Sequence, residues 1–248
     1  LVLAAWLIFA FVSRTMFVVS APRCTLTFSA IGSQGRLGNQ LFQLSALVSL
    51  ARTHRVPWRL SSDISHSEVA KLFDLSKYAT MTAQVQTIKV SEGDEDKISG
   101  LCRNGSIIDL EGYYQALEHV ENASAQLGRI LRFRKQLLST IVAEFPQLKS
   151  RNVVTLHVRR GDYVKFQYWY RVLEAQYYVM TLALIKDFDE IIVVSDDHAW
   201  VNEILIPAIR RRFTDVKISI SSGESFVHDF VLLHLGKRII LANSTFSW

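Results

Sequence analysis

Cysteine and proline are scarce in this sequence, and each scarcity excludes a class of protein. Its 248 residues include 2 cysteines, 4 prolines and 11 glycines. So little proline and glycine excludes a collagen-like or low-complexity chain. Two cysteines, Cys24 and Cys102, allow one disulfide but no cysteine-rich zinc site. Because apolar residues make up 49% of the chain, we expect a globular protein with one large or two small domains.

A strong excess of charge is also missing. The net charge at pH 7 is +5, and the basic residues are scattered apart from RRRF at residues 210 to 213. A modest positive charge suits an anionic ligand. An RNA-binding surface would need aromatic residues interleaved with basic ones on a sheet face, a setting that the arginines of the main motif lack. We therefore expect no nucleic acid partner.

Apolar residues concentrate at the N-terminus. Residues 1 to 13, LVLAAWLIFAFVS, carry no charge, which is typical of a signal-peptide core. Continuing through Arg14 to Val19 gives a segment that can cross a bilayer. A buried core helix is the alternative, which the following Pro22 and Cys24 disfavour. We predict that residues 1 to 22 form a signal peptide or a signal-anchor helix.

Three sequons accompany this segment. Asn104 and Asn122 lie in polar stretches, where a lumenal protein would be glycosylated, and we predict both as glycosylation sites. Asn243 lies in an apolar motif, and we expect it to be unmodified.

The order of apolar patterns predicts two α/β halves, separated by a break at residues 146 to 150. In the first half we expect strands at 25 to 31, 56 to 60 and 106 to 114, a helix at 41 to 54, a charged loop at 91 to 100 and helices within 117 to 145. The helix at 41 to 54 is predicted to bury one face, formed by Leu41, Leu44, Leu47, Val48 and Ala51.

In the second half, strands at 153 to 158, 191 to 195, 216 to 220 and 239 to 242 alternate with helices near 174 to 186, 198 to 212 and 226 to 235. Such alternation predicts a mostly parallel sheet. We expect domains at residues 24 to 150 and 151 to 248, with a ligand between them.

The segment VVTLHVRRGDY, which begins at residue 153, places charge at the end of a predicted buried strand. The carboxyl ends of strands in open α/β sheets usually bind ligands. Forked guanidiniums from Arg159 and Arg160, next to a glycine turn, suit a diphosphate, and Asp162 would hold an arginine in place. A structural ion pair and an RGD adhesion motif are the alternatives. His157 is the remaining polar residue of the segment.

Two further segments carry weaker signals. In GRLGNQLFQ, Gly35 and Gly38 permit close backbone approach, and Asn39 and Gln40 open a helix whose free amides favour an anion. A plain helix cap explains this segment equally well. The segment matches neither the dinucleotide fingerprint nor a Walker loop.

Near the C-terminus, Ser244, Thr245 and Ser247 follow a predicted strand, where hydroxyls either cap a helix or bind phosphate. Asp229 is a lone carboxylate in an apolar helix, costly unless paired. It suits the N1 and N2 hydrogens of a guanine, and an N-terminal helix position is its alternative role.

Acidic pairs raise the question of a metal. Asp196 and Asp197 follow a predicted strand and precede a helix, so N-capping explains them. Residues 94 to 96, DED, resemble a nucleotide-metal motif but lie in a charged loop. Arginines can meet phosphate charge instead, and we expect no metal or other cofactor.

Six segments, taken together, resemble the α-1,2-fucosyltransferases, with a close similarity to nematode members. They occur in that family's order across roughly residues 27 to 248: GRLGNQLFQ, EGYYQ, HVRRGDY, the tyrosines at 177 and 178, VSDDHAW, and HDFVLLHLGKRIILANSTFSW. The resemblance implies an α/β fold of the GT-B type, in which two Rossmann-like domains face a cleft. Residues 24 to 150 would be the acceptor-side domain and residues 151 to 248 the GDP-fucose-binding domain.

The resemblance also implies roles for the candidate residues. Arg159 and Asn39 would be catalytic. The donor site would comprise His157, Arg159, Arg160, Asp162, Asp229, Ser244, Thr245, Ser247, Gly38 and Asn39. In it, Arg159 would grip the diphosphate, Asp229 would read guanine, and Asn39 would approach from the opposite wall. No residue is identified as the general base, and the leaving phosphate is an alternative proton acceptor.

The implied reaction moves L-fucose from GDP-β-L-fucose to the 2-hydroxyl of a galactose on a glycan acceptor, with inversion and without metal. The implied location is the Golgi membrane, as a single-pass type II protein with a lumenal catalytic domain, or a secreted form. The alternative is a catalytically inactive nucleotide-sugar or glycan-binding protein of the same fold. Two departures from the family occur, at residues 233 to 236 and beyond Trp248, and we expect the second domain to be truncated at its end.

Overall fold

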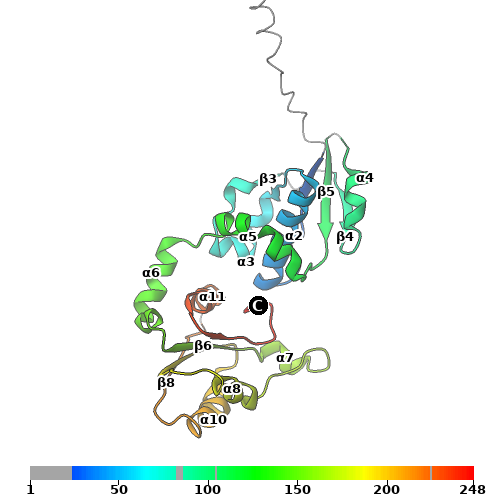
Figure 1. Cartoon of the computed structure of the whole chain (residues 1–248). Coiled ribbons are helices and arrows are strands. Elements are labelled where there is room, and N and C mark those ends of the chain that lie inside the picture. Colours follow the sequence, from blue (N-terminus) through cyan, green and yellow to red (C-terminus); the bar gives the residue numbers. More distant parts are fainter. Residues whose placement is uncertain (1–23, 82–85, 104, 224) are drawn as a thin grey trace, which may run out of the picture.

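Two parallel sheets organise the protein (Figure 1). The computed structural model describes residues 24–81, 86–103, 105–223 and 225–248. The first sheet has the order β1-β5-β4 and contains β1 (Cys24–Thr27), β5 (Ser106–Glu111) and β4 (Ile88–Ser91). The register aligns Cys24 with Ser106 and Thr27 with Asp109. A separate parallel pair consists of β2 (Leu60–Ser61) and β3 (Ala79–Met81).

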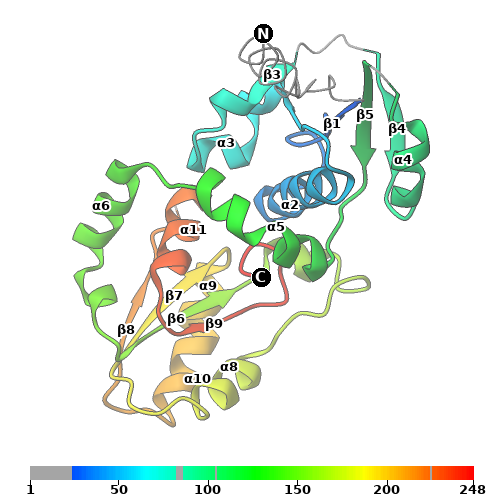
Figure 2. The same cartoon turned by 45° about the horizontal axis from the view of Figure 1, so that its top comes forward.

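Helices surround the first sheet, with α2 on one side and α4 on the other in Figure 1. The helices of the first half are α2 (Leu37–His54), α3 (Glu68–Leu72), α4 (Ile98–Leu101), α5 (Leu117–Ile130) and α6 (Lys135–Glu144), of which α6 packs against α11 of the second half. Short 3-10 turns are η1 (Ser62–His66), η2 (Ser76–Tyr78), η3 (Glu95–Lys97) and η4 (Pro146–Lys149). In Figure 2, α6 runs along one side of the molecule between the two sheets.

The second sheet has the order β8-β7-β6-β9 and is also parallel throughout. Its strands are β6 (Val153–Val158), β7 (Glu190–Ser195), β8 (Lys217–Ile220) and β9 (Ile239–Ile240). Its helical segments are α7 (Gly161–Lys165), α8 (Ala175–Leu182), α9 (His198–Trp200), a π-helical turn η5 (Val201–Leu205), α10 (Ile206–Arg210) and α11 (Phe226–Leu235). The predicted alternation and parallel sheet are confirmed.

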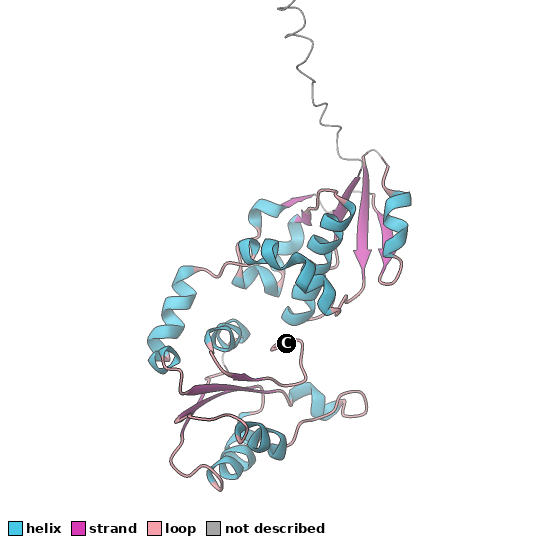
Figure 3. Cartoon of the chain, viewed as in Figure 1, coloured by secondary structure: helices cyan, strands magenta, loops and turns pink. Residues whose placement is uncertain are grey.

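Helices lie on both faces of the second sheet (Figure 3), and its central strands β6 and β7 are buried. All six residues of β6 are buried. Alternate side chains point to opposite faces of a strand, and Val154 and Leu156 accordingly join a cluster with α8 and α10, whereas Val153 joins the other core. Burial on both faces explains why apolar residues predominate in β6 and β7, with Thr155 and His157 as polar exceptions in β6.

One apolar core connects the two halves. A single cluster of buried side chains contains Leu26 and Ile108 from the first sheet together with Ile192 and Val194 from β7. Leu232 of α11 belongs to the same cluster. The two halves therefore pack against each other through apolar side chains, whereas the sequence led us to expect two domains that face each other across a cleft.

Helix α2 differs from the prediction of a single buried face. Polar Gln43, Ser45 and Ser49 are buried as fully as their apolar neighbours, whereas Leu41 is partly exposed. The reason is that α2 packs against β1, α3 and α5 at once. Gln43 offsets its burial by donating from Nε2 to the carbonyl of Gly112 at 3.0 Å.

Three predicted elements also differ in extent. The strand expected at 56 to 60 is only a bridge around Trp58 followed by β2, because Pro57 lacks an N–H for a ladder. The helix expected at 198 to 212 contains η5, since Pro207 cannot donate to the carbonyl four residues earlier. The charged loop at 91 to 100 contains η3 and the start of α4.

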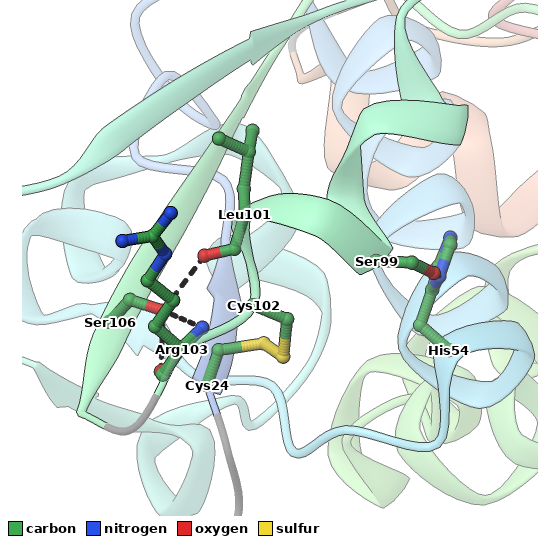
Figure 4. The surroundings of a disulfide bond; sticks show 7 residues. All are labelled: Cys24, His54, Ser99, Leu101, Cys102, Arg103 and Ser106. Carbon is green, nitrogen blue, oxygen red and sulfur yellow. Dashed lines mark hydrogen bonds between the residues drawn. A yellow bond between two sulfur atoms is a disulfide. The ribbon is translucent and has the colours of Figure 1, made fainter.

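Cys24 and Cys102 form the one disulfide that the sequence allows, joining the start of β1 to the end of α4 (Figure 4). Near it, the hydroxyl of Ser106 accepts from the backbone N–H of Arg103 at 3.0 Å. The predicted glycosylation site Asn104 and the predicted signal segment at residues 1 to 22 lie outside the described residues. Each helix in the described ranges is too short or too polar to span a bilayer.

Candidate functional site

The candidate residues of the second half gather at the carboxyl edge of its sheet. β6 and β7 are neighbours, with Val158 aligned with Ser195. The residues that follow these strands, Arg159 and Arg160 on one and Asp196 on the other, therefore lie side by side. This is the edge at which parallel α/β sheets bind ligands.

Arg159 is held by two carboxylates. One terminal nitrogen donates to Asp196 Oδ2 at 2.6 Å, and the other donates to Asp162 Oδ1. The side chain is 17% exposed, and the guanidinium carbon lies 5.4 Å from the centre of the Tyr163 ring. The expected pairing of Asp162 with an arginine is confirmed, and Asp196 is a second partner that the sequence analysis assigned only to a helix cap.

Arg160 turns to a different set of neighbours. Its Nε donates to Asp197 Oδ2 at 3.2 Å, and its guanidinium lies 4.1 Å from the centre of the Trp200 ring. Its backbone N–H donates to Asp196 Oδ1 at 2.8 Å. Asp197 also accepts from the N–H of Trp200 at 3.1 Å, so its predicted N-cap role is confirmed. These contacts favour the structural ion-pair interpretation for Arg160.

Both arginines are paired with carboxylates, whereas the sequence indicated only the pairing of Asp162 with one of them. Arg159 and Arg160 carry two positive charges, whereas Asp162, Asp196 and Asp197 around them carry three negative ones. The cluster is therefore not positive overall. Both arginines are fixed in position by these ion pairs. An anionic ligand has to displace a carboxylate before it can bind both terminal nitrogens of Arg159.

His157 lies inside the protein at the end of β6. It is 4% exposed, and its ring centre is 5.4 Å from that of Phe246. Burial, with a smaller effect of the positive charge of Arg159, lowers the pKa of His157 to about 3. The imidazole is therefore neutral at physiological pH, and its buried Nδ1 has no hydrogen-bond partner among the described residues.

The start of α2 meets the C-terminal segment (residues 241–248) across the protein. A side-chain carbon added to Gly38 would lie 2.3 Å from the carbonyl oxygen of Thr245. Beside this contact, Oδ1 of Asn39 accepts from Thr245 Oγ1 at 3.3 Å and from Gln115 Nε2 at 2.8 Å. Gly38 does permit a close approach, but the approaching backbone is the protein's own.

The helix start itself is less open to an anion than expected. α2 begins at Leu37, two residues before Asn39, and the Leu37 N–H donates to Glu68 Oε2 at 2.6 Å. A carboxylate of α3 thus already occupies one of the free amides.

The hydroxyls of the C-terminal segment hold a turn. Ser244 Oγ accepts from the N–H of Phe246 at 3.3 Å, and Ser247 Oγ donates to the carbonyl of Ala242 at 3.4 Å. Residues 241–248 contain turns and no helix, so the predicted helix-capping role is not what these hydroxyls do in the described chain. Ser244 is buried, and Thr245 and Ser247 are partly exposed.

Asp229 lies apart from the arginines, on α11 near the end of β8. Ser221 Oγ donates to its Oδ1, and His228 Nδ1 lies 3.9 Å from the same oxygen. His228 Nε2 in turn lies 2.7 Å from Glu144 Oε2 of α6. Burial raises the pKa of Asp229, whereas the hydrogen bond from Ser221 lowers it. The apolar sequence of α11 suggested that Asp229 is a lone carboxylate, but Ser221 and His228 lie beside it.

Sequence reasoning missed five of these side chains: Glu144, Tyr163, Asp196 in its pairing role, Ser221 and His228. For Asp196 a signal existed, because the predicted parallel neighbours at 153 to 158 and 191 to 195 end at the same edge. Ser221 and Glu144 gave no signal, since each reaches the site only through tertiary packing.

A cavity of about 370 Å³ lies between α2, α5, α11 and the C-terminal segment. Its lining is largely apolar and includes Phe42, Leu127, Phe230 and Trp248. It touches the candidate set only at Gly38 and Thr245, and no arginine of the cluster lines it.

Among the described residues, no group of three or more acidic, histidine or cysteine side chains is arranged to hold a metal. The acidic segment at residues 94 to 96 overlaps η3, where Asp94 accepts from Lys97 Nζ at 2.6 Å.

Two parallel sheets covered by helices, with a polar cluster at the carboxyl edge of one sheet, define an α/β protein of the GT-B-like class. Comparison with known proteins identifies the group within it. Residues 6–248 match the family described as Glycosyl transferase family 11, and the chain belongs to that family.

Two relatives from Escherichia coli are similar in sequence. The O-antigen biosynthesis glycosyltransferase WbnK is 31% identical over 106 residues, which is 40% of this chain and 34% of the relative. An alpha-1,2-colitosyltransferase is 32% identical over 173 residues, which is 64% of this chain and 54% of the relative. The chain thus spans about a third and about half of the length of these relatives.

Solved structures share the fold. POFUT1 in complex with GDP-fucose superposes with a TM-score of 0.60 at 12% identity, over 91% of this chain and 93% of that one. The fucosyltransferase NodZ from Bradyrhizobium superposes with a TM-score of 0.54 at 12% identity, over 91% of both chains. At this identity the likeness establishes the fold, and the expectation of a GT-B-like α/β fold is confirmed to that extent.

Proposed function

We propose that this protein transfers L-fucose from GDP-β-L-fucose to the 2-hydroxyl of a galactose on a glycan, with inversion and without a metal. One observation carries the proposal: a fixed guanidinium, Arg159, at the carboxyl edge of the second sheet in a chain of Glycosyl transferase family 11. A relative named as an alpha-1,2-colitosyltransferase supports the linkage, and a structure of the same fold that holds GDP-fucose supports the donor.

In the proposed complex, the donor diphosphate exchanges with Asp162 or Asp196 at Arg159. Negative charge grows on the leaving diphosphate as the bond to fucose breaks, and a cation already in place stabilises it where it develops. The two carboxylates keep the guanidinium oriented before the donor arrives, so little reorganisation remains for the reaction itself. Arg160 supports this arrangement through Asp197 and Trp200.

Asp229 is the proposed reader of guanine. A carboxylate can accept from N1 and N2 of that base together, and the hydrogen bond from Ser221 to Oδ1 helps to keep Asp229 ionised within the protein. Asn39, held by Thr245 and Gln115, presents its remaining amide hydrogens from the opposite side. We propose domain limits of 24 to 150 and 151 to 248 for the two walls.

The test uses the whole chain with GDP-fucose and a β-galactoside. We expect acceptor-dependent GDP release, a product with an α linkage at galactose O2 by NMR, and unchanged activity in EDTA. Arg159→Ala should lower turnover about a hundredfold to a thousandfold, the usual effect of removing one such donor. Arg210→Ala, at an exposed arginine of α10, is the matched control and should leave turnover unchanged.

A folded Arg159→Ala variant with normal turnover would refute the assignment of the site. GDP-fucose binding without any transfer by the wild-type protein would instead support the alternative, an inactive nucleotide-sugar or glycan-binding protein of this fold.

We also propose a Golgi location, as a type II membrane protein with residues 1 to 22 as its anchor or signal. The disulfide between Cys24 and Cys102 supports an oxidising compartment. Asn122 is exposed on α5 and is proposed as a glycosylation site with Asn104. Expression of the full-length protein in a eukaryotic cell, followed by glycosidase treatment, tests this: an Asn122→Gln variant should lose one mobility shift.

A further inference from the structure

An aromatic turn (residues 166–170) between α7 and α8 leaves large side chains in solvent. Tyr168 is 97% exposed and Trp169 is 82% exposed, the highest values for aromatic residues in the described chain. Phe166 beside them is 53% exposed. Contiguous exposed aromatic groups usually mark an interaction surface, because burying them elsewhere would have stabilised the fold.

The structure holds this turn in place. Two backbone hydrogen bonds to the carbonyl of Phe166 close it, from Trp169 at 2.8 Å and from Tyr170 at 3.0 Å. The Tyr170 ring stacks on Tyr163, with ring centres 4.5 Å apart and planes 13° from parallel.

A second anchor joins the turn to the C-terminal segment. Asn243 Nδ2 donates to the carbonyl of Arg171 at 2.8 Å, and the Asn243 carbonyl accepts from Tyr163 Oη at 3.1 Å. A binding surface that is already ordered loses less entropy when its ligand arrives. The exposure of Tyr168 and Trp169 therefore belongs to a fixed turn.

The aromatic turn is continuous with the candidate donor site. Arg159 lies 5.4 Å from the ring of Tyr163, and Tyr163 stacks on Tyr170 within the turn. In Figure 1 the segment beyond α7 projects at the side of the lower sheet, near the level of the C-terminal segment. A molecule resting on the turn would lie beside the site where the donor diphosphate is proposed to bind.

The chemistry of the turn fits a neutral sugar. A galactopyranose has one face of C–H groups, which packs on the flat face of an indole or phenol ring, while its hydroxyls stay hydrated at the rim. Exposed polar neighbours, Lys165, Gln167 and Arg171, can meet those hydroxyls. Lys165 and Arg171 are the only basic residues between positions 165 and 171, so the turn lacks the basic groove that single-stranded nucleic acid requires.

We propose that Tyr168 and Trp169 form the acceptor subsite, on which a galactose-containing oligosaccharide stacks during transfer. The proposal rests on the proposed fucosyl transfer and names its acceptor-binding residues. Stacking on an exposed ring contributes to binding of the acceptor and leaves the bonds to the donor unaffected.

The experiment measures initial rates with Trp169→Ala, Trp169→Leu, Trp169→Phe and Tyr168→Ala. We expect both alanine variants and Trp169→Leu to raise KM for the β-galactoside at least tenfold, and Trp169→Phe to raise it by less. KM for GDP-fucose and the affinity for GDP should stay within twofold of wild type. Leu184→Ala, at a side chain that is 83% exposed just after α8, is the matched control and should change neither constant.

Because both aromatic residues are exposed, thermal unfolding of every variant should match wild type, which separates loss of binding from loss of fold. If wild type transfers fucose and Trp169→Ala keeps the acceptor KM, the subsite is refuted and the proposed function stands. Oligonucleotide binding that depends on Trp169, with an unchanged acceptor KM, also refutes it. If wild type neither transfers nor binds GDP-fucose, the proposed function fails; direct NMR titration with a β-galactoside then tests the aromatic turn alone, and an unaffected titration in Trp169→Ala refutes it.

Discussion

Gly38→Ala tests the contact on which the two sides of the candidate site depend. The added methyl group would lie 2.3 Å from the carbonyl oxygen and 2.4 Å from the carbonyl carbon of Thr245. The obstacle is backbone and cannot rotate away. Either the start of α2 or the C-terminal segment therefore has to retreat by roughly 1 Å to reach an ordinary contact distance.

Overpacking of this kind typically costs about 1 to 3 kcal/mol. In a chain of this length, each kcal/mol lowers Tm by roughly 2 to 4 °C. The retreat also separates Asn39 from Thr245, and a displacement of about 1 Å in a reacting site can cost on the order of a hundredfold in rate. We expect Gly38→Ala to lower both Tm and fucosyl transfer.

Gly128→Ala is the matched control, because it makes the same chemical change in a helix with open space around it. Gly128 is exposed on α5, and an added side-chain carbon meets nothing within 4 Å. Alanine favours a helix over glycine by about 1 kcal/mol, so Tm should rise. If differential scanning calorimetry shows that Gly38→Ala raises Tm as Gly128→Ala does, and if fucosyl transfer by Gly38→Ala is normal, the backbone contact between Gly38 and Thr245 does not form in solution.

Three further predictions concern stability and binding. Burial and Arg159 lower the pKa of His157 from 6.5 to about 3 in the folded protein. As the pH falls below 6.5, His157 is therefore protonated in the unfolded chain while it is still neutral in the folded one. The free energy of unfolding should therefore fall as the pH decreases from 6.5 towards 3, by about 2 kcal/mol between pH 7 and 5. Urea unfolding should show this loss in wild type and not in His157→Leu. Replacing Cys24 and Cys102 together by serine should cost about 4 kcal/mol, because the disulfide closes a loop with a sequence separation of 78, and an unchanged urea midpoint would contradict this. Asp229→Asn should weaken GDP binding about tenfold to a hundredfold in calorimetry, because an amide cannot accept two hydrogens as a carboxylate does; equal affinity in both proteins would remove guanine reading from this residue.

Much of the architecture was predictable because the central strands of the second sheet, β6 and β7, are buried on both faces. Largely apolar, β-branched segments such as Val153 to Val158 indicate buried strands, and their regular alternation with helices implied parallel order. The N-terminal half was harder. The strand expected at residues 56 to 60 does not form in full, because Pro57 has no backbone N–H to donate. The burial of α2 on all sides depends on neighbouring elements, which the apolar pattern of one helix does not show.

The sequence indicated most of the residues that form the candidate site, but it indicated few of the contacts between their side chains. Arg159 and Asp162 lie in one short segment, from which the pairing of Asp162 with an arginine was expected. The second carboxylate at Arg159, from Asp196, needs the register between two strands. Ser221 contacts Asp229 only because the segment after β8 returns to α11, which no local pattern records. The residues of the cluster were therefore named from the sequence, whereas the pairing of Asp196 with Arg159 was not.

β9 pairs with β6, although they are the last and the first strands of their sheet along the chain. During synthesis, β1, β4 and β5 are all available once residue 111 has left the ribosome, so the first sheet can assemble early. The second sheet must wait for Ile239 and Ile240, and the residues around Arg159 stay without their C-terminal cover until then. Ribosome-stalled chains of increasing length should accordingly gain protease resistance in two separate steps, the later one only after residue 240 emerges.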